Sequence, residues 1–151
     1  MILIASNLLI LRDQGIITLR EPIVSLQSGF NRDVSRTATW LQAHYDGDTM
    51  LLEGPGNELL QFTAQLPLKN LIYEGSYKLW ELALSDPAHY AEWIFMRSRS
   101  DTSEQGDKVW QRWNNDPYLH QHYTLVYEGD YQQIYRRRTA PQSNLLNRFV
   151  N

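Results

Sequence analysis

A loop that contains two glycines is the stretch of this sequence with the clearest potential for binding chemistry. Residues 50–60 read MLLEGPGNELL, in which Gly54 and Gly56 separate an apolar run from a helix-like pattern. Glycine at such a turn lets the backbone approach a phosphate closely, and the N-terminus of the following helix favours negative charge. The chemistry suggested by this stretch is therefore the binding of a nucleotide or another small anion.

The other residues of the loop argue against a nucleotide. A dinucleotide-binding fingerprint requires a third glycine at the place where Leu59 stands. Pro55 has no N–H group to offer a phosphate, and Asn57 and Glu58 occupy the places of the P-loop lysine and hydroxyl residues. We therefore expect a tight turn between a strand and a helix. The alternative is a free-standing α/β protein that binds a nucleotide or small anion at residues 54–57.

Two glutamates provide the second set of candidate residues. Glu53 and Glu74 each end a short apolar run and each precede a glycine. In a parallel sheet the carboxyl ends of the strands line the usual binding crevice, so both side chains can face one cleft. They can equally bind N–H groups of the loops. The candidate ligand or interdomain contact residues are Glu53, Gly54, Gly56, Glu74 and Gly75, and we expect none of them to be catalytic.

Other reactive constellations have little support in the sequence. The chain has no cysteine, which excludes disulfides, zinc–cysteine sites and thiol catalysis. His120 and His122 would share a face if they lay on a strand, but no carboxylate lies at a convincing ligand spacing. We therefore expect exposed histidines before a strand, with no metal and no cofactor. The net charge of −3 argues against a nucleic-acid partner. The run from Arg136 to Arg138 is expected to blunt an exposed edge strand.

Apolar residues at helical spacing predict four helices. The first covers residues 31–45, and the expected N-caps of the other three are Asn57, Ser76 and Asp107. The expected buried faces are Val34, Ala38, Leu41 and Tyr45 in the first helix; Leu59, Phe62, Thr63 and Leu66 in the second; Leu79, Trp80, Ala83 and Leu84 in the third; and Val109, Trp110 and Trp113 in the fourth.

Apolar runs between these helices predict the strands. Three strands are expected at residues 49–53, 70–74 and 93–96, and Gly129-Asp130 predicts a two-residue hairpin between strands at 123–128 and 131–137. Strands that alternate with helices require crossover connections, which produce a parallel sheet. We therefore predict an α/β fold, a three-layer sandwich with a mainly parallel, Rossmann-like sheet and a C-terminal antiparallel β-hairpin.

The two ends of the chain differ from the middle. Residues 1–11 read MILIASNLLIL and are nearly all apolar, but spanning a bilayer takes about 20 apolar residues. The segment also lacks the basic start and the cleavage site of a signal peptide. It is either the first element of the core or the end of a membrane helix. The expected division is an apolar lead-in at 1–20, a single α/β domain at 21–138 and a C-terminal tail at 139–151.

The order and spacing of several short motifs resemble a known family. They are Asn31-Arg32 with Ala38 and Leu41, Thr49-Met50-Leu51-Leu52, Leu71-Ile72-Tyr73-Glu74-Gly75, Trp80 with Ala83-Leu84 and Asp86-Pro87, Ala91-Glu92-Trp93-Ile94, Asp107-Lys108-Val109, and Tyr127 to Tyr135-Arg136-Arg137. This pattern resembles the soluble C-terminal extracytoplasmic region of GT-C-type membrane glycosyltransferases, the protein-O-mannosyltransferase-like group that uses polyprenyl-phosphate sugars. The resemblance covers residues 21–138 and includes no catalytic motif.

The resemblance implies a non-catalytic accessory domain of a polytopic hexosyltransferase. In that family the membrane-embedded part binds the lipid-linked donor, and the catalytic acid lies in an early extracytoplasmic loop that matches no position of this chain. The implied location is the extracytoplasmic side of a bacterial cell membrane. The implied partner is the transmembrane part of the same polypeptide, with the lipid-linked sugar donor reached only through the parent enzyme. We then expect the chain to be a detached part of that enzyme.

Overall fold

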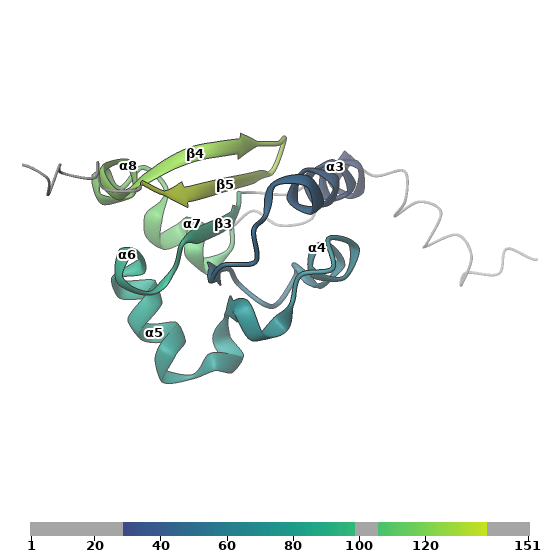
Figure 1. Ribbon diagram of the computed structural model, residues 1–151. Coiled ribbons are helices and arrows are strands. Elements are labelled where there is room, and N and C mark those ends of the chain that lie inside the picture. Colours follow the sequence, from purple (N-terminus) through teal and green to yellow (C-terminus); the bar gives the residue numbers. More distant parts are fainter. Residues whose placement is uncertain (1–28, 99–105, 139–151) are drawn as a thin grey trace, which may run out of the picture.

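The computed structural model describes residues 29–98 and 106–138 (Figure 1). The predictions for the apolar lead-in and the C-terminal tail fall outside these residues. None of the described helices is long and apolar enough to cross a membrane. In chain order the elements are α3 (Gly29–His44), β1 (Met50–Leu51), α4 (Glu58–Thr63), η1 (Leu68–Asn70), β2 (Leu71–Ile72), η2 (Glu74–Ser76), α5 (Lys78–Ser85), α6 (Pro87–Tyr90), β3 (Trp93–Arg97), α7 (Lys108–Trp113), α8 (Pro117–His122), β4 (Tyr123–Glu128) and β5 (Gln132–Arg137).

The five strands form one open sheet in the order β2-β1-β3-β5-β4. β1 pairs in parallel with β2 and β3, whereas β5 pairs antiparallel with β3 and β4. The sheet is therefore parallel at one end and antiparallel at the other. This arrangement confirms the mixed α/β class and the C-terminal antiparallel hairpin, with β4 at the edge.

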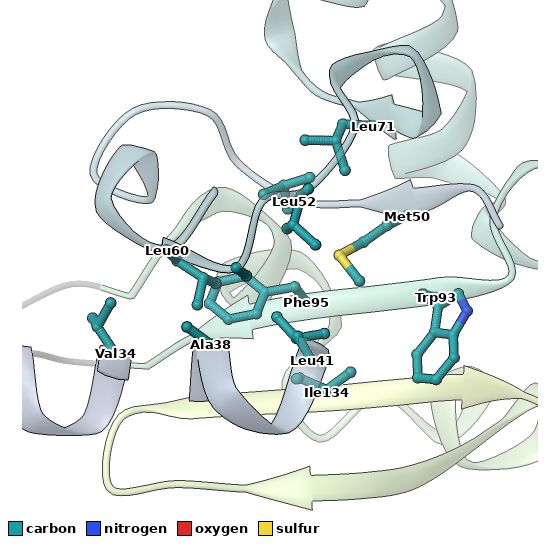
Figure 2. Close-up of a cluster of buried hydrophobic side chains, with 12 residues drawn as sticks. Val34, Ala38, Leu41, Met50, Leu52, Leu60, Leu71, Trp93, Phe95 and Ile134 are labelled. Carbon is teal, nitrogen blue, oxygen red and sulfur yellow. The ribbon is translucent and has the colours of Figure 1, made fainter. Parts of the chain in front are cut away.

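Successive side chains of the central strand β3 enter two different hydrophobic clusters. Trp93 and Phe95 pack in the cluster that contains residues of α3 and α4, as Figure 2 shows. Ile94 and Met96 pack in the cluster that contains residues of α5, α7 and α8. Neighbouring residues of a strand point to opposite faces of its sheet, so each face has its own core. This explains why the apolar run of β3 is continuous instead of alternating.

Helix α3 has the predicted buried face. Val34, Ala38 and Leu41 are almost fully buried, and they point toward Leu60 of α4 and Phe95 of β3 (Figure 2). Residues four and three apart lie on the same side of a helix, which is the spacing of these three. α3 is therefore one wall of the first hydrophobic cluster.

Helix α4 buries a different face from the predicted one. Leu60 and Ala64, one turn apart, are buried against α3, whereas Leu59 is 49% exposed and Phe62 is 84% exposed. Leu66 is buried as predicted, but it follows the helix. Both pairs fit helical spacing, so the apolar pattern alone cannot choose between them. Contact with α3 decides, because Val34, Ala38 and Leu41 pack with Leu60 and Ala64 in one cluster.

One of the predicted N-caps is confirmed and one is wrong in detail. The carboxylate of Asp107 accepts the backbone N–H of Trp110 at 2.7 Å at the start of α7, as predicted. Asn57 does precede α4, but its side chain accepts no hydrogen bond from the helix. Its amide instead donates to the carbonyl of Glu53 at 2.9 Å, which closes the turn from β1 into α4.

The beginning of α5 also differs from the prediction. Ser76 does not cap this helix: its hydroxyl accepts the N–H of Tyr73 at 3.3 Å and closes the short helix η2. α5 begins after Tyr77, which has a φ of +51° and a side chain 84% exposed. Trp80 and Ala83 are buried as predicted, whereas Leu79 is exposed.

The hairpin connection has three residues instead of the predicted two, because β4 ends at Glu128 and β5 begins at Gln132. The reason is a contact from another element. Asp33 of α3 accepts the N–H groups of Asp130 and Tyr131 at 3.0 and 2.8 Å. These bonds add to the local hydrogen bond from the N–H of Gly129 to the carbonyl of Gln132 at 2.7 Å, so the loop conformation depends on α3.

The apolar pattern did not reveal two short helices. His120 and His122 lie in α8, directly before strand β4, since Asp116 caps a helix there by accepting the N–H of Tyr118 at 2.9 Å. The short helix α6 was not predicted either.

The arginine run from Arg136 to Arg138 does not blunt an edge strand, because β5 lies inside the sheet between β3 and β4. Arg136 pairs with Asp46, and Arg137 pairs with Glu92. Arg138 donates from its side chain to the carbonyl of Tyr123.

Candidate functional site

The carboxyl ends of β1 and β3 are the place where this topology would hold a ligand. The chain passes from β1 through α4 to β2 on one side of β1, whereas β3 lies on the other side. Such a reversal of strand order opens a crevice at the carboxyl ends of the strands. Glu53 follows β1, Glu74 follows β2 and Arg97 ends β3. Because the three strands are parallel, all of these positions lie at the edge of the sheet formed by the carboxyl ends of the strands.

Glu74 is bound to the glycine loop across this edge. Its carboxylate Oε2 accepts the backbone N–H of Gly54 at 2.8 Å, and its Oε1 lies 3.5 Å from Nζ of Lys108. A Cβ atom on Gly54 would come 3.3 Å from the Glu74 carboxylate, so glycine lets the two approach. The loop therefore binds a carboxylate of its own chain at the N–H group that would face a phosphate.

Glu53 lies beside this pair. Burial and the charge of Glu74 raise the pKa of Glu53, and the backbone N–H and charge of Lys108 act in the opposite direction. Glu53 and Glu74 are therefore close enough to interact. Both also contact groups of the chain, which corresponds to the alternative that they hold loops.

Gly56 lies against a residue that the sequence did not single out. A Cβ atom on Gly56 would come 2.6 Å from Nη2 of Arg97, and the φ of Gly56 is +79°. The guanidinium of Arg97 is therefore placed over the glycine loop. The only signal in the sequence was an arginine at the end of an otherwise apolar strand.

Asp107 joins the end of β3 to the start of α7. Its Oδ2 accepts the backbone N–H of Arg97 at 2.8 Å, and its own N–H donates to the carbonyl of Arg97 at 2.9 Å. Burial raises the pKa of Asp107 to about 7, with a contribution from Glu53, although the N–H groups of Trp110 and Arg97 oppose this rise. The carboxyl group of Asp107 thus titrates near neutral pH.

The last predicted contact residue, Gly75, has a structural explanation. A Cβ atom at this position would clash with the ring of Tyr73, which packs over the glycine. Tyr73 in turn lies against the hydrophobic cluster of α3 and α4. Gly75 therefore makes room for an aromatic side chain, and its absence of a side chain is explained without a ligand.

Buried polar groups surround the same end of the sheet. Asp33, Thr37, Asn57 and Gln132 are each at most 2% exposed. Thr37 donates to the hydroxyl of Tyr127 at 3.2 Å. Gln132 is the exception, since neither atom of its amide has a hydrogen-bond partner among the described residues. No property of the sequence indicated that this glutamine would be buried.

The arrangement is better suited to holding loops together than to binding an anion. Three carboxylates, from Glu53, Glu74 and Asp107, lie at this edge together with the cations of Arg97 and Lys108. A phosphate would meet these carboxylates as well as the cations, and like charges repel. In the described part of the chain no group of three or more metal-ligating side chains is found.

A hollow lies between the ends of α3 and α4, away from the carboxyl ends of the strands. It is an open groove of about 530 Å³, lined by Leu41, Gln42, Tyr45, Asp46, Gly47, Ala64, Gln65 and Pro67. Burial and the charges of two nearby aspartates raise the pKa of Tyr45 to about 12. Its phenol is therefore un-ionised at neutral pH, and the groove contains none of the predicted contact residues.

Comparisons of the chain with protein-family models, with curated proteins and with solved structures find no match.

Proposed function

We propose that the chain is a non-catalytic extracytoplasmic accessory domain of a polytopic bacterial membrane glycosyltransferase. The parent enzyme would transfer a sugar from a polyprenyl-phosphate donor. The transmembrane part of the same polypeptide would be the partner of this domain. We also propose that the described sheet is a reduced form of a three-layer, Rossmann-like arrangement.

The observation that supports an accessory role is the hydrogen bond that the N–H of Gly54 donates to the carboxylate of Glu74, with an N···O distance of 2.8 Å. A general base needs free access to the proton that it removes. Glu74 is instead engaged with a loop N–H and with Lys108. Departure of a polyprenyl phosphate also requires positive charge around the leaving group, whereas here the cations of Arg97 and Lys108 lie among three carboxyl groups. On this proposal the chemistry belongs to the membrane part, and the domain contributes shape at the acceptor path.

The alternative of a small-anion or nucleotide site at residues 54–57 has less support. The N–H of Gly54 is bound to Glu74, and the N–H of Asn57 donates to the carbonyl of Gly54 at 3.2 Å. Pro55 has no N–H group. The guanidinium of Arg97 over Gly56 is the one feature that favours an anion.

The proposal can be tested with the complete reading frame. The gene would be sequenced upstream of the Met1 codon, and the full-length protein would be expressed in membranes. Membranes and the isolated chain would then be incubated with a polyprenyl-phosphate sugar and a mixed set of acceptors. We expect upstream membrane helices in frame, transfer by the membranes and no transfer by the isolated chain.

Two results would overturn the proposal. The first is a reading frame without upstream membrane helices. The second is turnover by the isolated chain that disappears in a Glu53→Gln or Glu74→Gln variant, because that would place the catalytic base in this domain. A Glu58→Gln variant is the matched control, since Glu58 is an exposed carboxylate of α4.

A further inference from the structure

Leu59 and Phe62 form an apolar patch on the outer side of α4, and we refer to these two residues as the α4 outer face. They lie three positions apart on the helix and are 49% and 84% exposed. Side chains at this spacing are neighbours on a helix surface. Single exposed apolar residues are ordinary on protein surfaces. Here, however, two large ones share one side of a helix of six residues.

We infer that the apolar segment Met1 to Leu11 of the same chain covers the α4 outer face. This inference does not depend on the proposed function. The segment is nearly all apolar and requires apolar surface to shield it from water. The α4 outer face offers such surface on the helix that packs against α3, the first described element.

The position at which the preceding chain joins the described structure supports this pairing. That chain enters at Gly29, the first residue of α3. Val34 of α3 packs in the same cluster as Leu60 of α4, and it lies about 7.5 Å along the helix axis from Gly29. Residues 12–28 join Gly29 to the segment, and a chain of that length reaches at most about 60 Å. The segment can therefore reach α4 without any change in the described fold.

The strength of the contact favours the chain's own segment over a second copy. A phenylalanine and a half-exposed leucine bury little apolar surface, so the dissociation constant of this contact is no lower than about 1 mM. A tethered segment is present at an effective concentration in the millimolar range, so it occupies such a weak contact far more than a free partner does. A second copy at micromolar concentration would need a contact about a thousandfold tighter.

The absence of cysteine from the chain allows a direct test by disulfide formation. Glu58→Cys places a thiol on exposed α4 beside Phe62, four positions away, and keeps the α4 outer face intact. It is combined with Leu9→Cys in the full chain. The matched control combines Leu9→Cys with Lys78→Cys, an exposed site next to Tyr77, whose ring is as exposed as that of Phe62. The yield of disulfide within one chain is measured on non-reducing gels and by mass spectrometry.

We expect at least a fivefold higher yield of the intrachain disulfide for the Glu58 pair than for the Lys78 pair. Adding Phe62→Ser to the Glu58 pair should reduce the yield to the control level, whereas adding Tyr77→Ser should leave it unchanged. Equal yields for the two pairs would overturn the inference. A disulfide that forms only between chains would assign the α4 outer face to a second copy. Binding of the full chain to anionic lipid vesicles that requires Phe62, without the intrachain disulfide, would assign it to a membrane surface.

Discussion

The carboxylate of Glu74 accepts the backbone N–H of Gly54 at 2.8 Å, although the two residues are 20 positions apart. This bond connects the loop after β1 to the end of the neighbouring strand β2. It gives the loop a bound anion from the chain itself. The glycine-rich appearance of residues 54–57 is therefore explained by a loop that must lie close to a side chain.

Replacement of Glu74 should destabilise the fold. Glu74→Ala leaves the N–H of Gly54 without its acceptor and should lower the free energy of unfolding by about 1–3 kcal/mol. Urea denaturation followed by tryptophan fluorescence would measure this change. Glu58→Ala is the control, since that carboxylate is exposed on α4. Lys108→Ala should cost less than about 1 kcal/mol because the lysine side chain is 55% exposed. If all three variants lowered the free energy of unfolding equally, the hydrogen bond from Gly54 to Glu74 would not be what holds the loop.

Gly129→Ala should disturb the hairpin specifically. A Cβ atom there would collide with the carboxylate of Asp33, which is fully buried and cannot move aside. We expect a loss of about 1–3 kcal/mol in the free energy of unfolding. Faster hydrogen exchange should also appear at the N–H groups of Asp130 and Tyr131, which Asp33 accepts.

Gly47→Ala is the matched comparison for that variant. Gly47 has a φ of +88°, and the atom nearest to an added Cβ is 3.8 Å away. This variant should therefore lose about 1–2 kcal/mol through backbone strain alone. Hydrogen exchange at the N–H groups of Asp130 and Tyr131 should rise only by the amount that the lower global stability causes. If both variants altered the hairpin amides equally, the contact between Gly129 and Asp33 would not be what holds the turn.

Stability should fall as the pH rises from 4 to 8 through the titration of Asp107. Its pKa is about 7 in the folded chain against an ordinary value of 3.8. Between these values the folded state holds a proton that the unfolded chain has released, so the stabilising contribution is complete below about pH 4 and is lost as the pH passes 7. The change is on the order of a few kcal/mol.

Asp107→Asn provides the comparison for this pH dependence. The amide of the variant can still accept the N–H of Trp110 but presents a poorer partner to the N–H of Arg97. That cost does not vary with pH, so the variant should be less stable at pH 5 and should show a flatter profile up to pH 8. Parallel profiles for the two proteins would show that Asp107 does not titrate in this range.

Gln132→Met should leave the stability unchanged or raise it. The amide of Gln132 is 1% exposed, and its oxygen and nitrogen have no hydrogen-bond partner within the described residues. A buried amide without partners costs about 1–3 kcal/mol, and a methionine of similar length removes that cost. Thermal and urea unfolding of the variant would measure the difference. A clear loss of stability would instead show that the amide binds an internal water molecule.

Nucleotides and sugar nucleotides should not stabilise the chain. A ligand at a hundredfold excess over its dissociation constant would add about 2.7 kcal/mol to the free energy of unfolding. A melting-temperature screen with a series of nucleotides detects a shift of that size. If a ligand does raise the melting temperature, Arg97→Gln tests whether the guanidinium over Gly56 is responsible.

Much of the fold could be predicted because its elements depend on local patterns. The buried face of α3 follows from Val34, Ala38 and Leu41, and the cap of α7 follows from Asp107 at the start of an apolar pattern. The antiparallel hairpin follows from two strand-like runs around Gly129-Asp130. In each of these cases the residues that determine the structure are neighbours in the sequence.

The wrong predictions concern structure that is determined by residues far apart in the sequence. Leu59 and Leu60 both fit an apolar helix face, and only contact with α3 makes Leu60 the buried one. The hairpin loop has three residues because Asp33, almost 100 positions earlier, accepts its N–H groups. The candidate site shows the same limit. Glu53, Gly54 and Glu74 were singled out from the sequence, but the guanidinium of Arg97, which lies over Gly56, was not. Contacts between residues far apart in the chain are not visible in apolar spacing.

The position of β3 at the centre of the sheet has a consequence for synthesis of the protein. One neighbour of β3, β1, precedes it in the chain, but the other, β5, consists of residues 132–137. A nascent chain that has not yet produced these residues has one unpaired edge along the apolar run Trp93 to Met96. Such an edge recruits strands from other chains. Ribosomes that stall or stop before residue 132 should therefore release a product that aggregates, while the completed chain closes this edge itself.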